Sequence, residues 1–121
     1  MNKRPILPVI LAGVFICAGL LNQPATAQPT PRRIEITARR FSFTPAEITL
    51  KKGEPVTLVL KSADVPHGLR FRELNVDIRV GRGAMTQASF TPESVGDFVG
   101  RCSVFCGAQH GSMKLTLHVV E

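Results

Sequence analysis

The sequence predicts an all-β domain built as a sandwich of two packed sheets. Three observations support this prediction. The chain contains about seven short segments rich in β-branched and other apolar residues. Glycine, proline, asparagine or aspartate residues bound these segments. The last segment alternates, with Leu115, Leu117 and Val119 on one face, which is typical of a strand buried on one side.

The expected strands follow one another at short intervals, and no segment after residue 33 has a sustained helical period. Residues 52–55 and 93–97 carry turn signals between strands. Residues 73–86 are the hardest to assign, and a turn of helix is one interpretation of them. The expected strands are Ile34–Ala38, Ile48–Leu50, Val56–Leu60, Leu69–Phe71, Ala88–Thr91, Asp97–Arg101 and Leu115–Val120.

The beginning of the chain has the parts of a secretory signal peptide. Lys3 and Arg4 form a basic head, an apolar run extends from Ile6 to Leu21, and small residues precede Ala27. The run is somewhat shorter than the ~20 residues that span a bilayer, so we expect export to the periplasm or outside the cell, with cleavage after Ala27. An uncleaved membrane anchor is the alternative. The expected organisation is a signal segment (1–27), a flexible lead-in (28–33) and a β domain (34–121).

Size and charge exclude several classes of function. A chain of 121 residues can form one core but leaves no room for a large multi-site enzyme. Its formal net charge is +6, yet it contains no tryptophan or tyrosine and no recognisable nucleic-acid-binding motif. We therefore expect no nucleic-acid partner. An acidic docking partner agrees better with the charge.

Four soft metal ligands lie close together just before the last expected strand: Cys102, Cys106, His110 and Met113. Three residues separate the cysteines, three separate Cys106 from His110, and two separate His110 from Met113. Such short gaps let one tight loop turn all four side chains inwards. Thiolate and thioether ligands combined with imidazole select copper over magnesium or calcium.

A second imidazole can come from a distant loop at the same end of the sandwich. His67 follows Pro66, whose ring restricts the backbone beside it. Asp64 lies three residues before this histidine and can orient its loop as a hydrogen-bond acceptor.

This constellation resembles the cupredoxins, and most closely the CuA domain of cytochrome c oxidase subunit II. Residues 41–53 are similar to the first strand pair of that family, and residues 64–67 to its upstream ligand loop. Residues 102–113 match its C-x3-C-x3-H-x2-M ligand loop at every ligand position. The resemblance extends from about Ile34 to the end of the chain. It implies a Greek-key β-sandwich.

The resemblance also implies a centre with two copper ions and no catalytic residue. The thiolates of Cys102 and Cys106 would bridge both ions, and each histidine would bind one of them. The function implied is transfer of single electrons in a respiratory chain, with a redox partner such as a c-type cytochrome or an oxidase. A copper chaperone is a further expected partner. The implied metal ligands are His67, Cys102, the backbone carbonyl of Val104, Cys106, His110 and Met113.

Two departures from the family favour a free-standing carrier. The family usually has glutamate where this chain has Val104, and that side chain helps to hold magnesium at the interface with the catalytic subunit. The tryptophan-containing cluster that accepts electrons from cytochrome c has no counterpart, because this chain contains no tryptophan. The electron-entry module of a terminal oxidase or of a nitrous oxide reductase remains the alternative.

Three other interpretations stay open on the sequence alone. Cys102 and Cys106 can form a disulfide in an oxidising compartment. A mononuclear blue-copper site needs only His67, Cys106, His110 and Met113. A copper-binding chaperone would use the same ligands but release the metal easily.

Three arginines are close in sequence to the expected ligands: Arg70, Arg72 and Arg101. A basic rim made of these residues would steer an acidic redox partner to the site. Ordinary solvated surface charge is the alternative interpretation.

Overall fold

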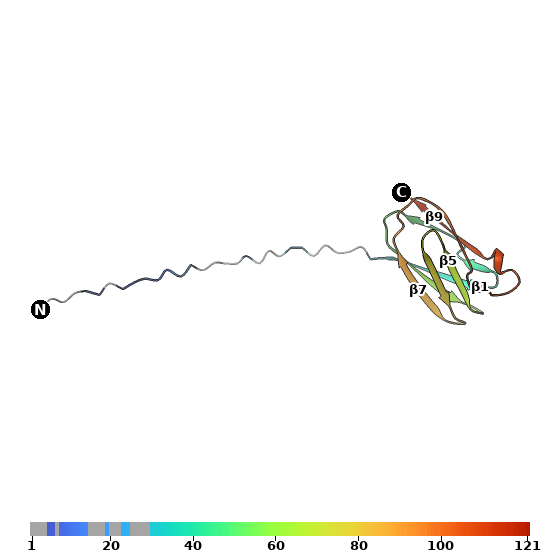
Figure 1. Cartoon of the computed structure of the whole chain (residues 1–121), viewed down its shortest axis with the longest axis horizontal. Coiled ribbons are helices and arrows are strands. Elements are labelled where there is room, and N and C mark those ends of the chain that lie inside the picture. The colour runs from blue at the N-terminus through green and yellow to red at the C-terminus, as the bar shows by residue number, and fades with distance from the viewer. Residues whose placement is uncertain (1–4, 7, 15–18, 20–22, 25–29) are drawn as a thin grey trace.

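The computed structural model describes residues 5–6, 8–14, 19, 23–24 and 30–121, and the last of these ranges forms a β-sandwich (Figure 1). Nine strands and one short 3-10 helix occur within the described residues. The predicted fold class is therefore confirmed. The elements are β1 (Arg32–Arg39), β2 (Ser42–Thr44), β3 (Glu47–Lys51), β4 (Val56–Ser62), β5 (His67–Phe71), β6 (Val76–Val80), β7 (Met85–Phe90), β8 (Gly96–Arg101), η1 (His110–Ser112) and β9 (Lys114–Val120).

The strands form two sheets that pack face to face. One sheet has the order β2-β1-β4-β7, and the other has the order β3-β9-β8-β5-β6. Most neighbours are antiparallel, but β1 pairs with β4 and β3 pairs with β9 in parallel. The pair β3–β9 joins strands from the two halves of the domain, since β3 ends at Lys51 and β9 begins at Lys114.

Alternating apolar side chains fill the space between the sheets. In β9 the expected alternation is confirmed: Leu115, Leu117 and Val119 are buried, whereas His118 lies on the opposite face. Leu58 and Leu60 of β4 are fully buried in the same core. Burial of these side chains supplies the main driving force for folding, at roughly 25 cal/mol per Å² of apolar surface removed from water.

Two strands were not among those expected. Residues 73–86 form a turn, strand β6 and the start of β7, so the suggested turn of helix is wrong. Val76, Ile78 and Val80 are buried and alternate with exposed charged residues, which defines a strand of five residues. Strand β2 has only three residues, too few to show a period in the sequence.

The predicted signal segment falls mainly on residues outside those that the structure describes. Lys3, Arg4, Ala27 and much of the apolar run between 6 and 21 lie there. Among the described residues, no helix has both the length and the apolar character needed to cross a membrane.

His118 links β9 to its two neighbouring strands on the outer face of the five-stranded sheet. Its Nδ1 lies 2.6 Å from Asp97 Oδ1 on β8, and its Nε2 lies 3.5 Å from Glu47 Oε1 on β3. The hydrogen bond that His118 donates to Asp97 raises the pKa of His118 above its ordinary value of 6.5, against the opposing effect of burial.

A pH-dependent contribution to stability follows from the raised pKa of His118. The folded state binds the proton more tightly, so the contribution is complete below pH 6.5 and is lost as pH rises through the folded pKa. We expect Asp97→Asn to lower the free energy of unfolding at pH 5.5 by more than at pH 9. Denaturant unfolding at both pH values measures this. An equal loss at both would show that the ion pair contributes nothing.

Candidate metal centre

The ends of three adjacent strands of the five-stranded sheet bring the site together. Strand β5 begins at His67, β8 ends immediately before Cys102, and β9 begins immediately after Met113. Because β5 and β9 both run antiparallel to β8, these three strand ends meet at one edge of the sheet. The loop 102–113 closes over this edge, at the end of the sandwich opposite to the C-terminus (Figure 1).

Two buried sulfur atoms form the centre of the site. Cys102 Sγ and Cys106 Sγ lie 3.8 Å apart, and both cysteines are free thiols. The thioether sulfur of Met113 lies 3.8 Å from Cys106 Sγ. The backbone carbonyl of Val104 accepts a hydrogen bond from Cys102 Sγ at 3.2 Å. Sulfur and carbonyl donors predicted from the sequence are therefore neighbours in space.

Each histidine faces a different cysteine. His67 Nδ1 lies 3.9 Å from Cys102 Sγ, and His110 Nδ1 lies 3.7 Å from Cys106 Sγ. The donor atoms of His67, Cys102 and Cys106 all lie within 4.8 Å of one another. The two imidazoles differ in burial, since His67 is fully buried whereas His110 is partly exposed.

Asp64 fixes the orientation of His67, as the sequence suggested. Its Oδ1 lies 2.6 Å from His67 Nε2, and its two carboxylate oxygens also accept hydrogen bonds from the backbone N–H groups of Arg40 and Val65 at 2.7 Å. Burial alone would raise the pKa of Asp64, but these hydrogen bonds outweigh it and lower the pKa to about 2. Because the carboxylate accepts the proton of Nε2, the lone pair of Nδ1 points towards the sulfurs.

Removing the carboxylate of Asp64 tests this arrangement. We expect Asp64→Asn to lower the free energy of unfolding of the reduced, metal-free chain by about 1–2 kcal/mol, because an amide replaces an acceptor of three hydrogen bonds. Denaturant unfolding at neutral pH measures the loss. Glu93→Gln is the matched control, since Glu93 is an exposed loop residue. Equal stability of the two variants would contradict the role given to Asp64.

The thiol of Cys106 is protonated in the metal-free protein at neutral pH. Burial, together with the hydrogen bond and charge interaction with Cys102, raises its pKa from 9.0 to about 11. A thiolate is the form that binds metal. Metal binding at this site must therefore displace a proton from Cys106, and the affinity for metal must rise with pH.

Arg40 and Phe41 support the site, although nothing in the sequence pointed to them. Arg40 Nε donates a hydrogen bond to the backbone carbonyl of Cys106 at 2.9 Å, across 66 positions in the sequence. A Cβ atom at Gly107 would lie 2.8 Å from the ring of Phe41, and Gly107 has a φ of +140°. The segment after β1 therefore holds the cysteine loop from the side of the other sheet.

The donor set fits copper. It consists of two thiols, two imidazole Nδ1 atoms, one thioether and one carbonyl, gathered within a largely buried cluster. Soft sulfur donors with imidazole favour copper, whereas magnesium and calcium favour oxygen. No buried side-chain nitrogen or oxygen of the described residues lacks a hydrogen-bond partner, so burial of the site leaves none of these polar atoms unsatisfied.

Comparison with known proteins identifies a matching family and several similar sequences. A family model described as a cupredoxin-like domain matches residues 9–116. A nitrous-oxide reductase of Cupriavidus necator is 34% identical over 92 residues, which cover 73% of this chain and 14% of that protein. A cytochrome c oxidase subunit 2 of Thermus thermophilus is 26% identical over 93 residues, covering 77% of this chain and 69% of that protein. The chain thus spans only a small part of the reductase.

Solved structures agree with the fold. The periplasmic domain of cytochrome oxidase subunit II from Bradyrhizobium japonicum superposes with a TM-score of 0.70 at 21% identity, covering 77% of this chain and 87% of that one. Auracyanin A, a blue copper protein of Chloroflexus aurantiacus, gives a TM-score of 0.62 at 18% identity, covering 75% of this chain and all (100%) of that one. The metal-binding domain of the Streptococcus pneumoniae Cu(I)-exporting ATPase CopA gives 0.61 at 25% identity, covering 74% and 85%.

Proposed function

This chain belongs to the cupredoxin-like domain family, and from that premise we propose that it is a copper protein that transfers single electrons through a two-copper centre of the CuA type. One observation carries the proposal. Two thiols lie 3.8 Å apart, and each is faced by the Nδ1 atom of a different histidine. The family and the cluster of His67, Cys102 and Cys106 support copper binding in general. The pairing of thiols and imidazoles supports two ions.

A single copper ion would leave part of this arrangement unused. A blue-copper site needs one thiolate, two imidazoles and a weak axial thioether. Cys106, His110 and Met113 supply three of these, since the imidazole and the thioether lie 3.7 Å and 3.8 Å from Cys106 Sγ. His67, however, faces the other sulfur, Cys102 Sγ. The backbone carbonyl of Val104 also lies beside Cys102 Sγ, at 3.2 Å. The six donors therefore divide into two sets that share the pair of sulfurs.

Copper held by Cys102, Cys106, His67 and His110 would supply a one-electron redox couple. The protein residues supply a fixed surrounding. Asp64 holds the ring of His67, and Arg40 holds the carbonyl of Cys106. Both cysteines are largely buried, which limits contact of the sulfurs with water. Ligands that keep their positions in both oxidation states make electron transfer fast, because little rearrangement accompanies it.

The deciding experiment is copper loading of the reduced full chain, followed by electron paramagnetic resonance. We expect binding to saturate at two copper ions per chain and the hyperfine splitting to be shared by two copper nuclei. Saturation at one ion, with splitting from one nucleus, would replace this proposal with a blue-copper carrier. Prior reduction is essential because a Cys102–Cys106 disulfide would block both thiolates.

We also propose a cellular location and a redox partner for this chain. We place residues 34–121 in an exported copper domain preceded by a signal or anchor segment (1–27) and a lead-in (28–33). The relatives include a periplasmic oxidase domain, which supports a location outside the cytoplasm. The redox partner would be a c-type cytochrome or an oxidase, and the chain itself catalyses no reaction. The alternative is that the chain acts as the electron-entry module of an oxidase or of a nitrous-oxide reductase.

A copper carrier that hands on the metal itself is a second candidate. The likeness to the metal-binding domain of a Cu(I)-exporting ATPase, at 25% identity, favours it. Such a protein must release copper readily. Incubation of the loaded chain with a modest Cu(I) chelator separates the candidates: rapid loss of both ions supports a chaperone, and retention supports an electron carrier.

A further inference from the structure

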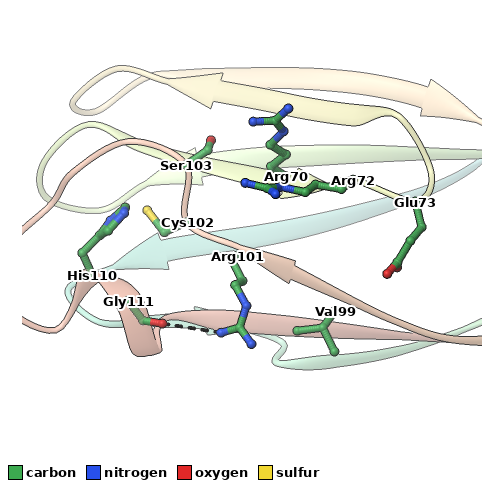
Figure 2. A pocket seen from close by; sticks show the side chains of 9 residues that line it. All are labelled: Arg70, Arg72, Glu73, Val99, Arg101, Cys102, Ser103, His110 and Gly111. Carbon is green, nitrogen blue, oxygen red and sulfur yellow. Dashed lines mark hydrogen bonds between the residues drawn. The ribbon is translucent and has the colours of Figure 1, made fainter.

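A basic hollow lies beside His110 on the outside of the site. It has a volume of about 690 Å³ and is lined by nine residues, shown in Figure 2. Three of them are exposed arginines: Arg70 and Arg72 at β5 and just after it, and Arg101 at the end of β8. Glu73 is the acidic residue of the lining, and Asp77 lines a neighbouring depression that shares Arg70 and Arg72 with the hollow. Three guanidinium groups therefore outnumber the carboxylates around the hollow.

Apolar side chains accompany these charges. Phe105 is 79% exposed, and its ring centroid lies 5.7 Å from that of His110. Val99 lines the hollow and is 42% exposed. Phe105 and Val99 place apolar surface beside the charged hollow, and apolar surface rimmed by charge is typical of interaction sites. We call Arg70, Arg72, Val99, Arg101 and Phe105 the arginine patch.

The arginine patch lies beside His110, a donor residue that is partly exposed. His110 lines the hollow, whereas His67 is fully buried on the other side of the sulfurs. Cys102 also lines the hollow, as Figure 2 shows. A protein that docks on this patch would lie against His110, whose Nδ1 is 3.7 Å from Cys106 Sγ.

We propose that the arginine patch is the docking surface for an acidic electron-transfer protein, whose carboxylates pair with Arg70, Arg72 and Arg101 while an apolar area around its own redox group covers Phe105. This inference rests on the proposed electron-transfer function and adds the charge of the partner to it. A small anion fits less well, because the guanidinium groups are exposed and Glu73 shares the hollow with them. Arg101 also donates a hydrogen bond from its guanidinium group to the backbone carbonyl of Gly111, at 3.5 Å.

The first test measures docking without copper. The reduced, metal-free, ¹⁵N-labelled full chain is titrated with an acidic and with a basic c-type cytochrome, both oxidised, at low ionic strength. We expect the acidic cytochrome to perturb the amide signals of residues 70–72 and 99–111, and salt to reverse the perturbation. Absence of these shifts, or equal shifts with the basic cytochrome, would overturn the inference.

Matched charge reversals provide the control. The double variant Arg70→Glu/Arg72→Glu makes the net charge of the patch more negative. The double variant Lys51→Glu/Lys52→Glu changes the net charge of the protein by the same amount, but at the opposite end of the sandwich, where Lys52 N donates a hydrogen bond to Val120 O. We expect the arginine variant to weaken binding of the acidic cytochrome about tenfold and the lysine variant to change it much less. Equal effects of both variants would show that only net charge matters, and would overturn a defined docking surface.

Two further measurements identify the class of partner and test the docking surface separately from the two-copper centre. Phe105→Ala is expected to weaken binding of the acidic cytochrome but not of hexacyanochromate(III), a small trivalent anion. If Phe105→Ala has no effect and hexacyanochromate binds as tightly as the cytochrome, the patch is a small-anion site and the inference fails. Copper paramagnetic resonance of the same variants tests the two-copper centre independently, so that loss of docking and absence of the centre are distinguished.

Discussion

Replacing Cys102 with serine is expected to abolish the two-copper spectrum and to reduce copper binding to one ion or none. Serine lacks the soft thiolate that both metal ions would share, and it stays protonated at neutral pH. Cys106, His110 and Met113 remain close to one another and can still hold a single ion. Copper stoichiometry and the number of nuclei in the hyperfine pattern are the two measurements.

Ser103→Ala is the matched control for this substitution. Ser103 follows Cys102 directly, but its hydroxyl donates a hydrogen bond to Asp77 at 3.2 Å and makes no described contact with the sulfurs. The control is expected to retain two copper ions. If Cys102→Ser left the spectrum unchanged from that of the unsubstituted chain, Cys102 would be a bystander and the centre would be mononuclear.

Substitution of Gly100 by alanine is expected to cause a large loss of stability, because the added methyl group would enter the packed core. A Cβ atom there would lie 2.5 Å from Phe71 Cζ and 2.8 Å from Leu69 Cδ1. Both side chains are buried in the core, with exposures of 1% and 0%, so neither can move aside without displacing others. Overpacking of this kind costs about 3 kcal/mol. We expect the melting temperature to fall by more than about 10 °C.

Gly81→Ala separates overpacking from the general effect of losing a glycine. A Cβ at Gly81 would lie 3.9 Å from Ala84 Cβ, which is ordinary van der Waals contact. Thermal unfolding of the reduced, metal-free variants gives the comparison. Similar melting temperatures for Gly100→Ala and Gly81→Ala would mean that the core between β5 and β8 is less tightly packed than described.

Sequence reasoning located most strands because their side-chain patterns are local. The alternation in β9 and the turn signals around β4 and β8 depend only on neighbouring residues. Strand β6 was missed although Val76, Ile78 and Val80 alternate with charged residues, which is the local pattern of a strand buried on one side. The 3-10 helix His110–Ser112 was not expected either, since a single turn leaves no period to detect.

The metal centre shows the same division between local and long-range information. Spacing alone suggested that Cys102, Cys106, His110 and Met113 converge, because a short loop cannot separate them widely. The place of His67 depends on the pairing of β5 with β8, which the sequence does not display. Nothing in the sequence indicates the hydrogen bond from Arg40 to the carbonyl of Cys106, because the two residues lie in loops that belong to different sheets. Side chains that support a site from a distance need a three-dimensional structure to be found.

Both ends of the β domain lie far from the cysteine loop. Strand β1 begins where Arg32 N bonds to Pro55 O, and β9 ends where Val120 O accepts a hydrogen bond from Lys52 N. The cysteine loop occupies the other pole (Figure 1). Immobilising the protein on an electrode or bead through a tag at the C-terminus (Figure 1) would therefore leave His110 facing the solution, whereas attachment through a surface lysine such as Lys114, beside Met113, would obstruct it.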